Sequence, residues 1–187
     1  MRQNTQAITL KKMLIGNRVP KEFFITSGIG ESNITIHAGS YHLALKNAGI
    51  EQCNIMTYSS ILPAIAQRID KESVDLVHGS VMETIMAVAH AKKGQRATAG
   101  IIFGWLYDKK TGEKHGGIVS EYNGALEETR AIETLHASLK EIYENGFSES
   151  FELKDIEIYT KSFVPDKEYG TALIALCFTN YEVPVEE

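Results

Sequence analysis

Short runs of apolar and β-branched residues, bounded by turn-forming residues, recur along the chain and predict β-strands. The runs cover residues 23–26, 53–58, 98–107, 117–122, 156–164 and 171–181. A further apolar run over residues 81–91 fits either a strand or a buried helix, and we favour a strand. The chain is therefore expected to consist mainly of strands.

Two segments predict helices instead. Residues 126–143 carry apolar side chains at intervals of three and four, which is typical of a helix with one apolar face, and Gly146 follows as a stop. The apolar residues are Ile132, Leu135, Leu139 and Ile142. Residues 38–48 predict a shorter helix, because Gly49 stands where a left-handed cap would end it.

The connecting segments complete the expected fold. Residues 108–112 (Asp-Lys-Lys-Thr-Gly) predict a hairpin turn, and residues 165–168 predict a second turn. A glycine-rich loop is expected over residues 27–32. Residues 1–20 are polar and predict an arm, followed by a single domain over residues 21–187. Frequent hairpins with two amphipathic helices predict an α+β layered sandwich.

Composition narrows the classes of protein. A chain of 187 residues with 43% hydrophobic residues is ordinary for one globular domain. A formal charge of −5 and the lack of a dense Lys/Arg run argue against a nucleic-acid partner. No apolar run is long enough for a secretory signal or a membrane span. The two cysteines, Cys53 and Cys177, lack metal or redox spacing and predict reduced thiols in the cytoplasm.

Three common kinds of site are disfavoured. The glycine-rich segment 28–33 ends in Asn33, where a dinucleotide fingerprint needs its third glycine. The six histidines form no H-x-x-x-H pair, so no metal is expected. No G-x-S-x-G elbow of a serine hydrolase is present.

The pair Ser59-Ser60 is unusual, because it ends the apolar run Ile55-Met56-Thr57-Tyr58 where a turn would ordinarily use Gly, Asn or Asp. One interpretation is a plain loop before Pro63. The other is a peptide bond that the protein itself breaks, and neighbouring segments favour this second interpretation.

The chain resembles the pyruvoyl-dependent arginine decarboxylase family in four segments that follow one another in the family's order and spacing. They are Asn-Ala-Gly-Ile at 47–50, Asn-Ile-Met-Thr-Tyr-Ser-Ser-Ile-Leu-Pro at 54–63, Glu-Thr-Ile at 83–85 and Gly-Ile-Val-Ser-Glu-Tyr at 117–122. The resemblance extends over about residues 23–178. One fragment alone would be weak evidence, and the ordered set is specific.

The resemblance implies that the hydroxyl of Ser60 attacks the carbonyl of Ser59 and that the resulting ester breaks by β-elimination. Residue 60 would become a covalent pyruvoyl group at the head of an α chain, 60–187, leaving a β chain, 1–59. The ketone would form a Schiff base with the amino group of a small-molecule substrate, an amino acid, and would accept electrons as carbon dioxide leaves. The expected reaction converts L-arginine to agmatine.

The resemblance also assigns roles to other residues. Glu121 would return a proton to carbon, and because this step is separate from cleavage, Glu121→Gln is expected to self-process. Matched substrate-binding positions are Asn54, Ile61 and Leu45, with Glu31, Glu83 and His42 as further candidates. Asn54 alternatively holds the turn, and a structural carboxylate is an equal alternative for Glu31 and Glu83.

His42 departs from the family pattern. Archaeal members have an aspartate at this position, which is expected to pair with the substrate guanidinium, and an imidazole cannot replace that carboxylate. Glu31, Glu83 or a neighbouring subunit is expected to supply the charge; otherwise the substrate is another amino acid.

Finally, the resemblance implies a four-layer αββα sandwich that assembles as a homotrimer or a pair of trimers, with active sites between protomers. A non-enzymatic oligomeric binding protein on the same fold is the alternative, because a fold does not determine a function. An intact single chain after purification would favour that alternative.

Overall fold

The structure is a computed structural model that describes residues 16–184. Its strands are β1 (Val19–Ser32), β2 (Asn54–Thr57), β3 (Ile61–Pro63), β4 (Gln67–Arg68), β5 (Val81–Lys92), β6 (Ala97–Asp108), β7 (Lys114–Gly124), β8 (Phe151–Phe163) and β9 (Tyr169–Glu182). Its helical elements are a π-helical segment (Ile36–Tyr41), α1 (His42–Ala48), a short 3-10 turn (Lys71–Ser73) and α2 (Glu128–Gly146).

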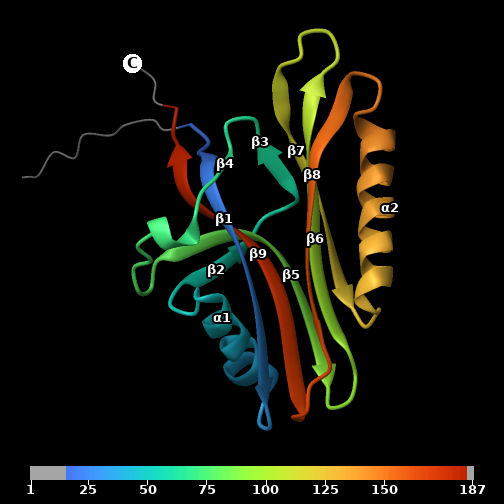
Figure 1. Cartoon of the computed structure of the whole chain (residues 1–187). Helices are drawn as coiled ribbons and strands as arrows, with labels where there is room; N and C mark the ends of the chain where they lie inside the picture. Colours follow the sequence, from blue (N-terminus) through green and yellow to red (C-terminus); the bar gives the residue numbers. More distant parts are fainter. Residues whose placement is uncertain (1–15, 185–187) are drawn as a thin grey trace, which may run out of the picture.

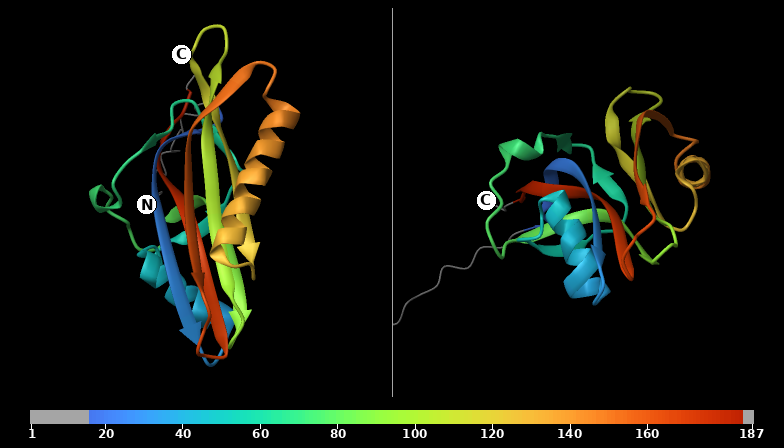
Figure 2. Two further views of the ribbon diagram at one scale, coloured as in Figure 1. Left: turned by 45° about the vertical axis from the view of Figure 1, so that its right-hand side comes forward. Right: turned by 60° about the horizontal axis from the view of Figure 1, so that its bottom comes forward.

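The strands form two sheets, one in the order β2-β5-β9-β1-β4 and one in the order β3-β7-β6-β8. Most neighbouring strands are antiparallel; β1 with β4 and β2 with β5 are parallel. The sheets pack face to face, with α1 and α2 on opposite outer sides (Figure 1; Figure 2). The expected α+β sandwich is therefore confirmed, with four layers in the order αββα.

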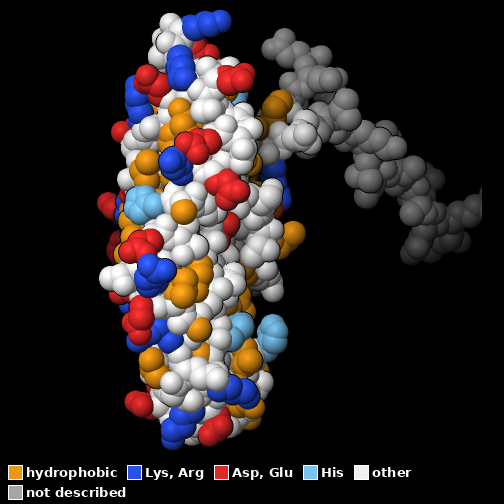
Figure 3. Space-filling view, turned by 90° about the vertical axis from the view of Figure 1, so that its right-hand side faces the viewer, with side chains coloured by type: hydrophobic (Ala, Val, Ile, Leu, Met, Phe, Trp, Pro, Cys, Tyr) orange, Lys and Arg blue, Asp and Glu red, His pale blue; other side chains and the backbone are white. Residues whose placement is uncertain are grey.

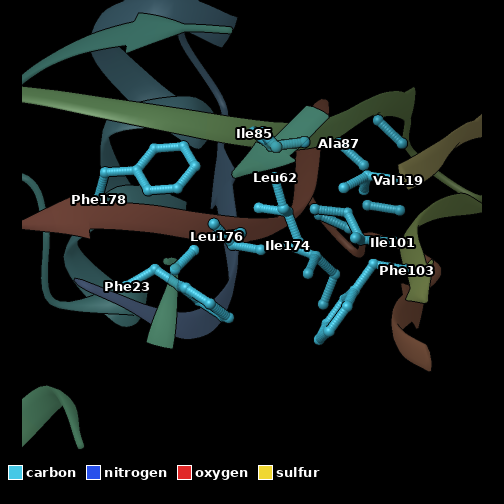
Figure 4. Close-up of a cluster of buried hydrophobic side chains, with 14 of the residues drawn as sticks. Phe23, Leu62, Ile85, Ala87, Ile101, Phe103, Val119, Ile174, Leu176 and Phe178 are labelled. Atoms are coloured by element: carbon cyan, nitrogen blue, oxygen red, sulfur yellow. The ribbon is translucent and has the colours of Figure 1, made fainter. Parts of the chain in front are cut away.

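Three clusters of buried side chains fill the three interfaces between these layers. The cluster between the sheets includes Phe23 and Phe178 (Figure 4), one under α1 includes Phe24 and Leu45, and one under α2 includes Leu135. Phe23 and Phe24 belong to different clusters because successive side chains on a strand point to opposite faces. Burial of each such side chain contributes about 1.5–3 kcal/mol to stability.

Two glycines expected in a loop lie instead inside β1, so the loop predicted over residues 27–32 is wrong. A Cβ atom at Gly28 would lie 2.0 Å from the carbonyl oxygen of Ala44, and one at Gly30 would lie 2.2 Å from that of Ser40. Without side chains at these positions, α1 and the π-helical segment approach the sheet backbone closely. The glycines serve packing and not a turn.

Most other elements are confirmed. The ambiguous run at 81–91 is the strand β5, the hairpin turn separates β6 from β7, and Gly49 ends α1 with a φ of 69°. The short strands β3 and β4 were not predicted. β1 begins at Val19, so it includes the last two residues of the expected arm, while residues 1–15 lie outside the described part of the chain.

The long helix α2 covers the outer face of the four-stranded sheet through Ala131, Leu135 and Leu139. Ile142, which the periodicity placed on the apolar face, is 37% exposed, because the buried stripe continues through Tyr143 and leaves Ile142 at its flank. The opposite surface mixes acidic and basic side chains with scattered apolar ones (Figure 3). The outer face of this helix is therefore exposed to solvent.

Within residues 16–184, neither helix has the length and apolar character needed to cross a membrane. In the same range, no group of three or more His, Cys, Asp or Glu side chains is arranged to hold a metal ion. Cys53 and Cys177 are both free thiols, and both are buried.

Candidate active site

The chain crosses from one sheet to the other at Tyr58, Ser59 and Ser60. β2 ends at Thr57 on an edge of the five-stranded sheet, and β3 begins at Ile61 on an edge of the four-stranded sheet. Four Cα-to-Cα steps span at most about 14 Å, while packed sheets lie about 10 Å apart. The candidate cleavage bond therefore lies in a short connection with little slack.

Backbone hydrogen bonds hold both ends of this crossing. The amide of Tyr58 donates to the carbonyl of Thr84 on β5 at 2.7 Å, and an amide of β7 donates to the carbonyl of Ser60 at 3.0 Å. Within the crossing, the amide of Ile61 donates to the carbonyl of Ser59 at 2.9 Å. A donor thus already points at the carbonyl oxygen that would gain negative charge during self-cleavage.

The hydroxyl of Ser60 donates a hydrogen bond to Glu121, with 2.6 Å between Oγ and Oε1. This distance is typical of a hydroxyl that donates to a carboxylate. Glu121 follows Val119 by two residues on β7, and alternate residues on a strand share a face, so both point between the sheets. Ser120 points the other way and donates to Ser138 on α2 at 2.8 Å.

This geometry brings a nucleophile, a base and an oxyanion donor to one peptide bond. The Glu121 carboxylate is placed to take the proton of the Ser60 hydroxyl, and the Ile61 amide is placed to stabilise charge on the Ser59 oxygen. Ser59 is exposed and Ser60 is half-buried. The arrangement is therefore equipped for attack of the hydroxyl on the preceding carbonyl.

A pocket of about 420 Å³ opens beside the bond. The described residues that line it are Arg18, Val19, Pro20, Thr57, Tyr58, Ser59, Ile61 and Pro63. Ile61 is 59% exposed at the mouth of this pocket, which suits the substrate-contacting role expected for it. The pocket combines apolar walls with one cationic side chain, the guanidinium of Arg18.

Glu83 lies on β5 at the same end of the sandwich. Its carboxylate is buried and forms an ion pair with Arg18, while Oε2 has no hydrogen-bond partner among the described residues. Glu83 precedes Thr84, which holds Tyr58, so the sheet places the ion pair next to the crossing. A buried carboxylate requires such a partner, because an unpaired buried charge costs several kcal/mol.

Aromatic rings surround this ion pair. The guanidinium carbon of Arg18 lies 5.1 Å from the ring centroid of Tyr181, and Tyr58 packs on Phe178 with 5.7 Å between ring centroids. Burial, with a smaller contribution from nearby Tyr58, raises the pKa of Tyr181 to about 12, so its hydroxyl stays neutral. One cation of the pocket, Arg18, therefore lies against a neutral phenol.

Asn54 lies at the start of β2, where its side-chain amide donates to the carbonyl of Gly79 at 2.8 Å. This bond fastens β2 to the loop before β5 and does not reach the turn at Ser59-Ser60, so the substrate-binding and turn-holding roles of Asn54 stay predictions. Its contact with Ser60 would require the chain between them to fold back, and β2 is extended.

The other expected substrate-binding residues lie away from Ser60 within this chain. Glu31 pairs in register with Gly170, whereas Glu83 pairs with Phe178, so eight residues, roughly 27 Å, separate the two glutamates along β9. Glu31 accepts a hydrogen bond from the amide of Asp166 at 2.6 Å. This contact fits the structural alternative for Glu31, in which its carboxylate is hydrogen-bonded within the fold.

His42 and Leu45 lie on α1. His42 is exposed at the first position of that helix, and Leu45 is buried in the cluster between α1 and the five-stranded sheet. α1 packs on Gly28 and Gly30 in the second half of β1 (Figure 1 shows α1 beside β1), whereas Val19 and Pro20 at the start of β1 share the pocket with Ser59. Within one chain, the structure therefore does not bring these two residues to the cleavage bond.

Sequence reasoning missed two parts of the site. Arg18 belonged to the expected arm, and nothing in its surroundings predicted the ion pair with Glu83. Tyr181 lies near the end of the last strand and carried no motif. The Ser60–Glu121 contact joins residues 61 positions apart, so only the family resemblance indicated it.

Comparison with known proteins agrees with this geometry. A family model described as pyruvoyl-dependent arginine decarboxylase matches residues 22–183. The chain is 31% identical over 190 residues to the Pyruvoyl-dependent arginine decarboxylase AaxB of Chlamydia abortus and 32% identical to that of Chlamydia caviae, covering 91% of this chain and 96% of each relative. It is 31% identical over 137 residues to the Pyruvoyl-dependent arginine decarboxylase of Methanocella arvoryzae, covering 66% and 78%. Since the match spans nearly all of the domain, including both strands that meet at Ser60, the chain belongs to the pyruvoyl-dependent arginine decarboxylase family.

Proposed function

We propose that this chain cleaves itself between Ser59 and Ser60 and then decarboxylates L-arginine to agmatine. The observation that carries the proposal is the 2.6 Å hydrogen bond from Ser60 Oγ to Glu121 Oε1 beside the carbonyl of Ser59. Family membership supports the same cofactor and the same class of substrate, a free amino acid as a small molecule.

In the cleavage step, Ser60 Oγ bonds to the carbonyl carbon of Ser59 as Glu121 takes the hydroxyl proton. The C–N bond between the two residues then breaks as the nitrogen takes that proton from Glu121, which leaves an ester and a free amine on residue 60. Loss of the α-proton of residue 60 then breaks the ester and expels the Ser59 carboxylate, leaving dehydroalanine at residue 60. Hydrolysis of this dehydroalanine by water releases ammonia. The result is a pyruvoyl group on residue 60 and a new carboxyl terminus on Ser59.

The residues present fit this group, because its precursor Ser60 lies between a carboxylate and the pocket. The pyruvoyl carbonyl supplies an electrophile for the substrate amine and an electron sink for decarboxylation. Glu121 is retained after cleavage, and we propose that it donates the proton to the substrate carbon once carbon dioxide has left. Ile61 and Pro63 give the pocket an apolar wall beside that step.

We also propose a homotrimer, or a pair of trimers, in which α1 of a neighbouring protomer approaches the pocket. Large apolar side chains are exposed on the two edge strands that flank the cleavage bond, Met56 at 52% on β2 and Ile61 at 59% on β3, and Val81 at the start of the adjoining strand β5 is 59% exposed. Exposed apolar side chains gathered at one edge favour association. His42 and Leu45 of a neighbouring protomer would then reach the pocket, which the same residues of one chain do not.

Light scattering of the purified protein tests the assembly, with Met56→Lys as the disruptive variant. A trimer or hexamer that dissociates in Met56→Lys supports the proposal, and a wild-type monomer contradicts it.

We also propose that the enzyme is cytoplasmic, because its two buried cysteines are free thiols.

The substrate is tested by incubating the processed protein with single amino acids and measuring the released carbon dioxide. Arginine should give the highest rate, with agmatine as product, and Ser60→Ala should release none. Faster release from another amino acid would leave the cleavage chemistry intact and overturn the arginine assignment. No release from any amino acid by a fully processed protein would favour the non-enzymatic binding protein.

A further inference from the structure

Self-cleavage between Ser59 and Ser60 creates a new anion at the pocket. When the ester breaks, Ser59 becomes a chain terminus with a carboxylate, directly beside the residue that must receive the substrate amine. Of the described residues that line the pocket shared with Ser59, only Arg18 carries a charge, and that charge is positive. This inference rests on the proposed self-cleavage.

Arg18 is held in place by two neighbours. One nitrogen of its guanidinium binds the buried carboxylate of Glu83, and the plane lies over the ring of Tyr181. A guanidinium has five N–H donors in a rigid fork, and its described side-chain contacts use one nitrogen. Its side chain is 55% exposed, so the remaining donors are accessible from the pocket.

The new terminus cannot move far from this cation. The amide of Tyr58 is tied to Thr84, and the ring of Tyr58 is packed on Phe178. Residue 59 follows with a Cα separation of about 3.8 Å. The Ser59 carboxylate is therefore tethered at the pocket wall, which gives it a high effective concentration near a matching cation.

We propose that Arg18 binds the carboxylate that self-cleavage forms on Ser59, bridging it to Glu83. A bidentate guanidinium–carboxylate contact draws the new terminus to the pocket wall. The carboxylate then no longer competes for the substrate amine, and access to residue 60 is open. Arg18 is thus a positioning residue that acts only once the chain is cut.

The proposal predicts that Arg18 stabilises the cut chain more than the uncut one. Melting temperatures are compared at one protein concentration for wild type, Arg18→Gln, Ser60→Ala and the double variant. Loss of the Glu83 ion pair lowers the melting temperature both in the cleaved protein and in the uncleaved Ser60→Ala protein. The difference between the two losses therefore isolates the contact between Arg18 and the Ser59 carboxylate. We expect a further loss of about 2–4 °C in the cleaved background alone.

A matched control is available at Arg68. Its side chain is 49% exposed, pairs with Glu157 and lies 5.4 Å from the ring centroid of Tyr159, so its setting resembles that of Arg18. Arg68→Gln should cost the same in both backgrounds. As a second readout, a carboxypeptidase should remove Ser59 faster from cleaved Arg18→Gln than from cleaved wild type, with Arg18→Lys intermediate.

Each failure has a separate signature. A wild-type protein that stays uncut would contradict the proposed function itself. A cut wild type with equal losses in both backgrounds would overturn only the role of Arg18, as would an Arg18→Gln variant that folds and does not cut. If Arg18→Gln instead raises the KM for arginine while inhibition by agmatine, which lacks the carboxylate, is unchanged, the cation serves the substrate and not Ser59.

Discussion

Replacement of Glu121 by glutamine tests whether this residue acts already in the formation of the cofactor. Glutamine preserves the size of the side chain and an acceptor oxygen at the place of Oε1, but it cannot take the proton of the Ser60 hydroxyl. The 2.6 Å contact between the two groups therefore changes the expectation from sequence, which was normal self-processing of Glu121→Gln. We now expect cleavage to slow.

The size of the effect follows from the step that is lost. General-base assistance contributes typically 10²- to 10⁴-fold to a rate, and each factor of ten corresponds to about 1.36 kcal/mol of barrier. Loss of the base at Ser60 should therefore raise the cleavage barrier by about 2.7–5.4 kcal/mol. The hydrogen bond from the Ile61 amide to the Ser59 carbonyl remains and supports a residual rate.

The assay is a time course of freshly synthesised protein on denaturing gels, in which uncut chain of 187 residues is resolved from its products. Glu157→Gln is the control, because Glu157 is also a half-buried, hydrogen-bonded glutamate of the same sheet, on β8. It should cut at the wild-type rate. If Glu121→Gln also cuts at the wild-type rate, Glu121 is not the base and the interpretation of the 2.6 Å contact is refuted.

Three further predictions concern other parts of the molecule. Gly30→Ala should destabilise the fold by about 1–3 kcal/mol in chemical denaturation, since its Cβ would lie 2.2 Å from a backbone oxygen, while Gly146→Ala, with open space around it, should not. Burial, with a smaller contribution from nearby His37, lowers the pKa of His90 below 6.5. The neutral imidazole therefore contributes to stability above pH 6.5, and this contribution is lost as the pH falls below 6.5. His90→Gln should flatten the fall in melting temperature from about pH 7.5 to 5, and an unchanged slope would count against this role of His90. His42→Asp should lower the KM for arginine if α1 of a neighbour faces the pocket, and an unchanged KM would argue against that arrangement.

The strands and helices were largely predictable because local pattern decides them. β6 and β9 are buried on both faces, with successive side chains in two different cores, and such strands appear in the sequence as continuous apolar runs. The errors arose where one segment's shape depends on another. Gly28 and Gly30 have the composition of a loop, and only the approach of α1 explains them inside a strand.

The site was predictable only in part, for a similar reason. Ser59 and Ser60 stood out locally, and the family resemblance supplied Glu121. Arg18 is brought to Glu83 by the pairing of β1 and β5 with β9, a long-range arrangement that no local spacing encodes. Within one chain, His42 and Leu45 make no contact with the cleavage bond, so neither sequence periodicity nor a single protomer supports their expected roles.

The central claim is that Ser60 becomes the cofactor, and intact-mass measurement of the denatured wild-type protein tests it most directly. The prediction is two chains, residues 1–59 and 60–187, with the larger chain resistant to Edman degradation because a pyruvoyl group replaces its amino terminus. Ser60→Ala should give a single uncut chain of 187 residues. A wild-type protein that remains one chain, or a larger fragment that begins with an ordinary serine, would contradict the account.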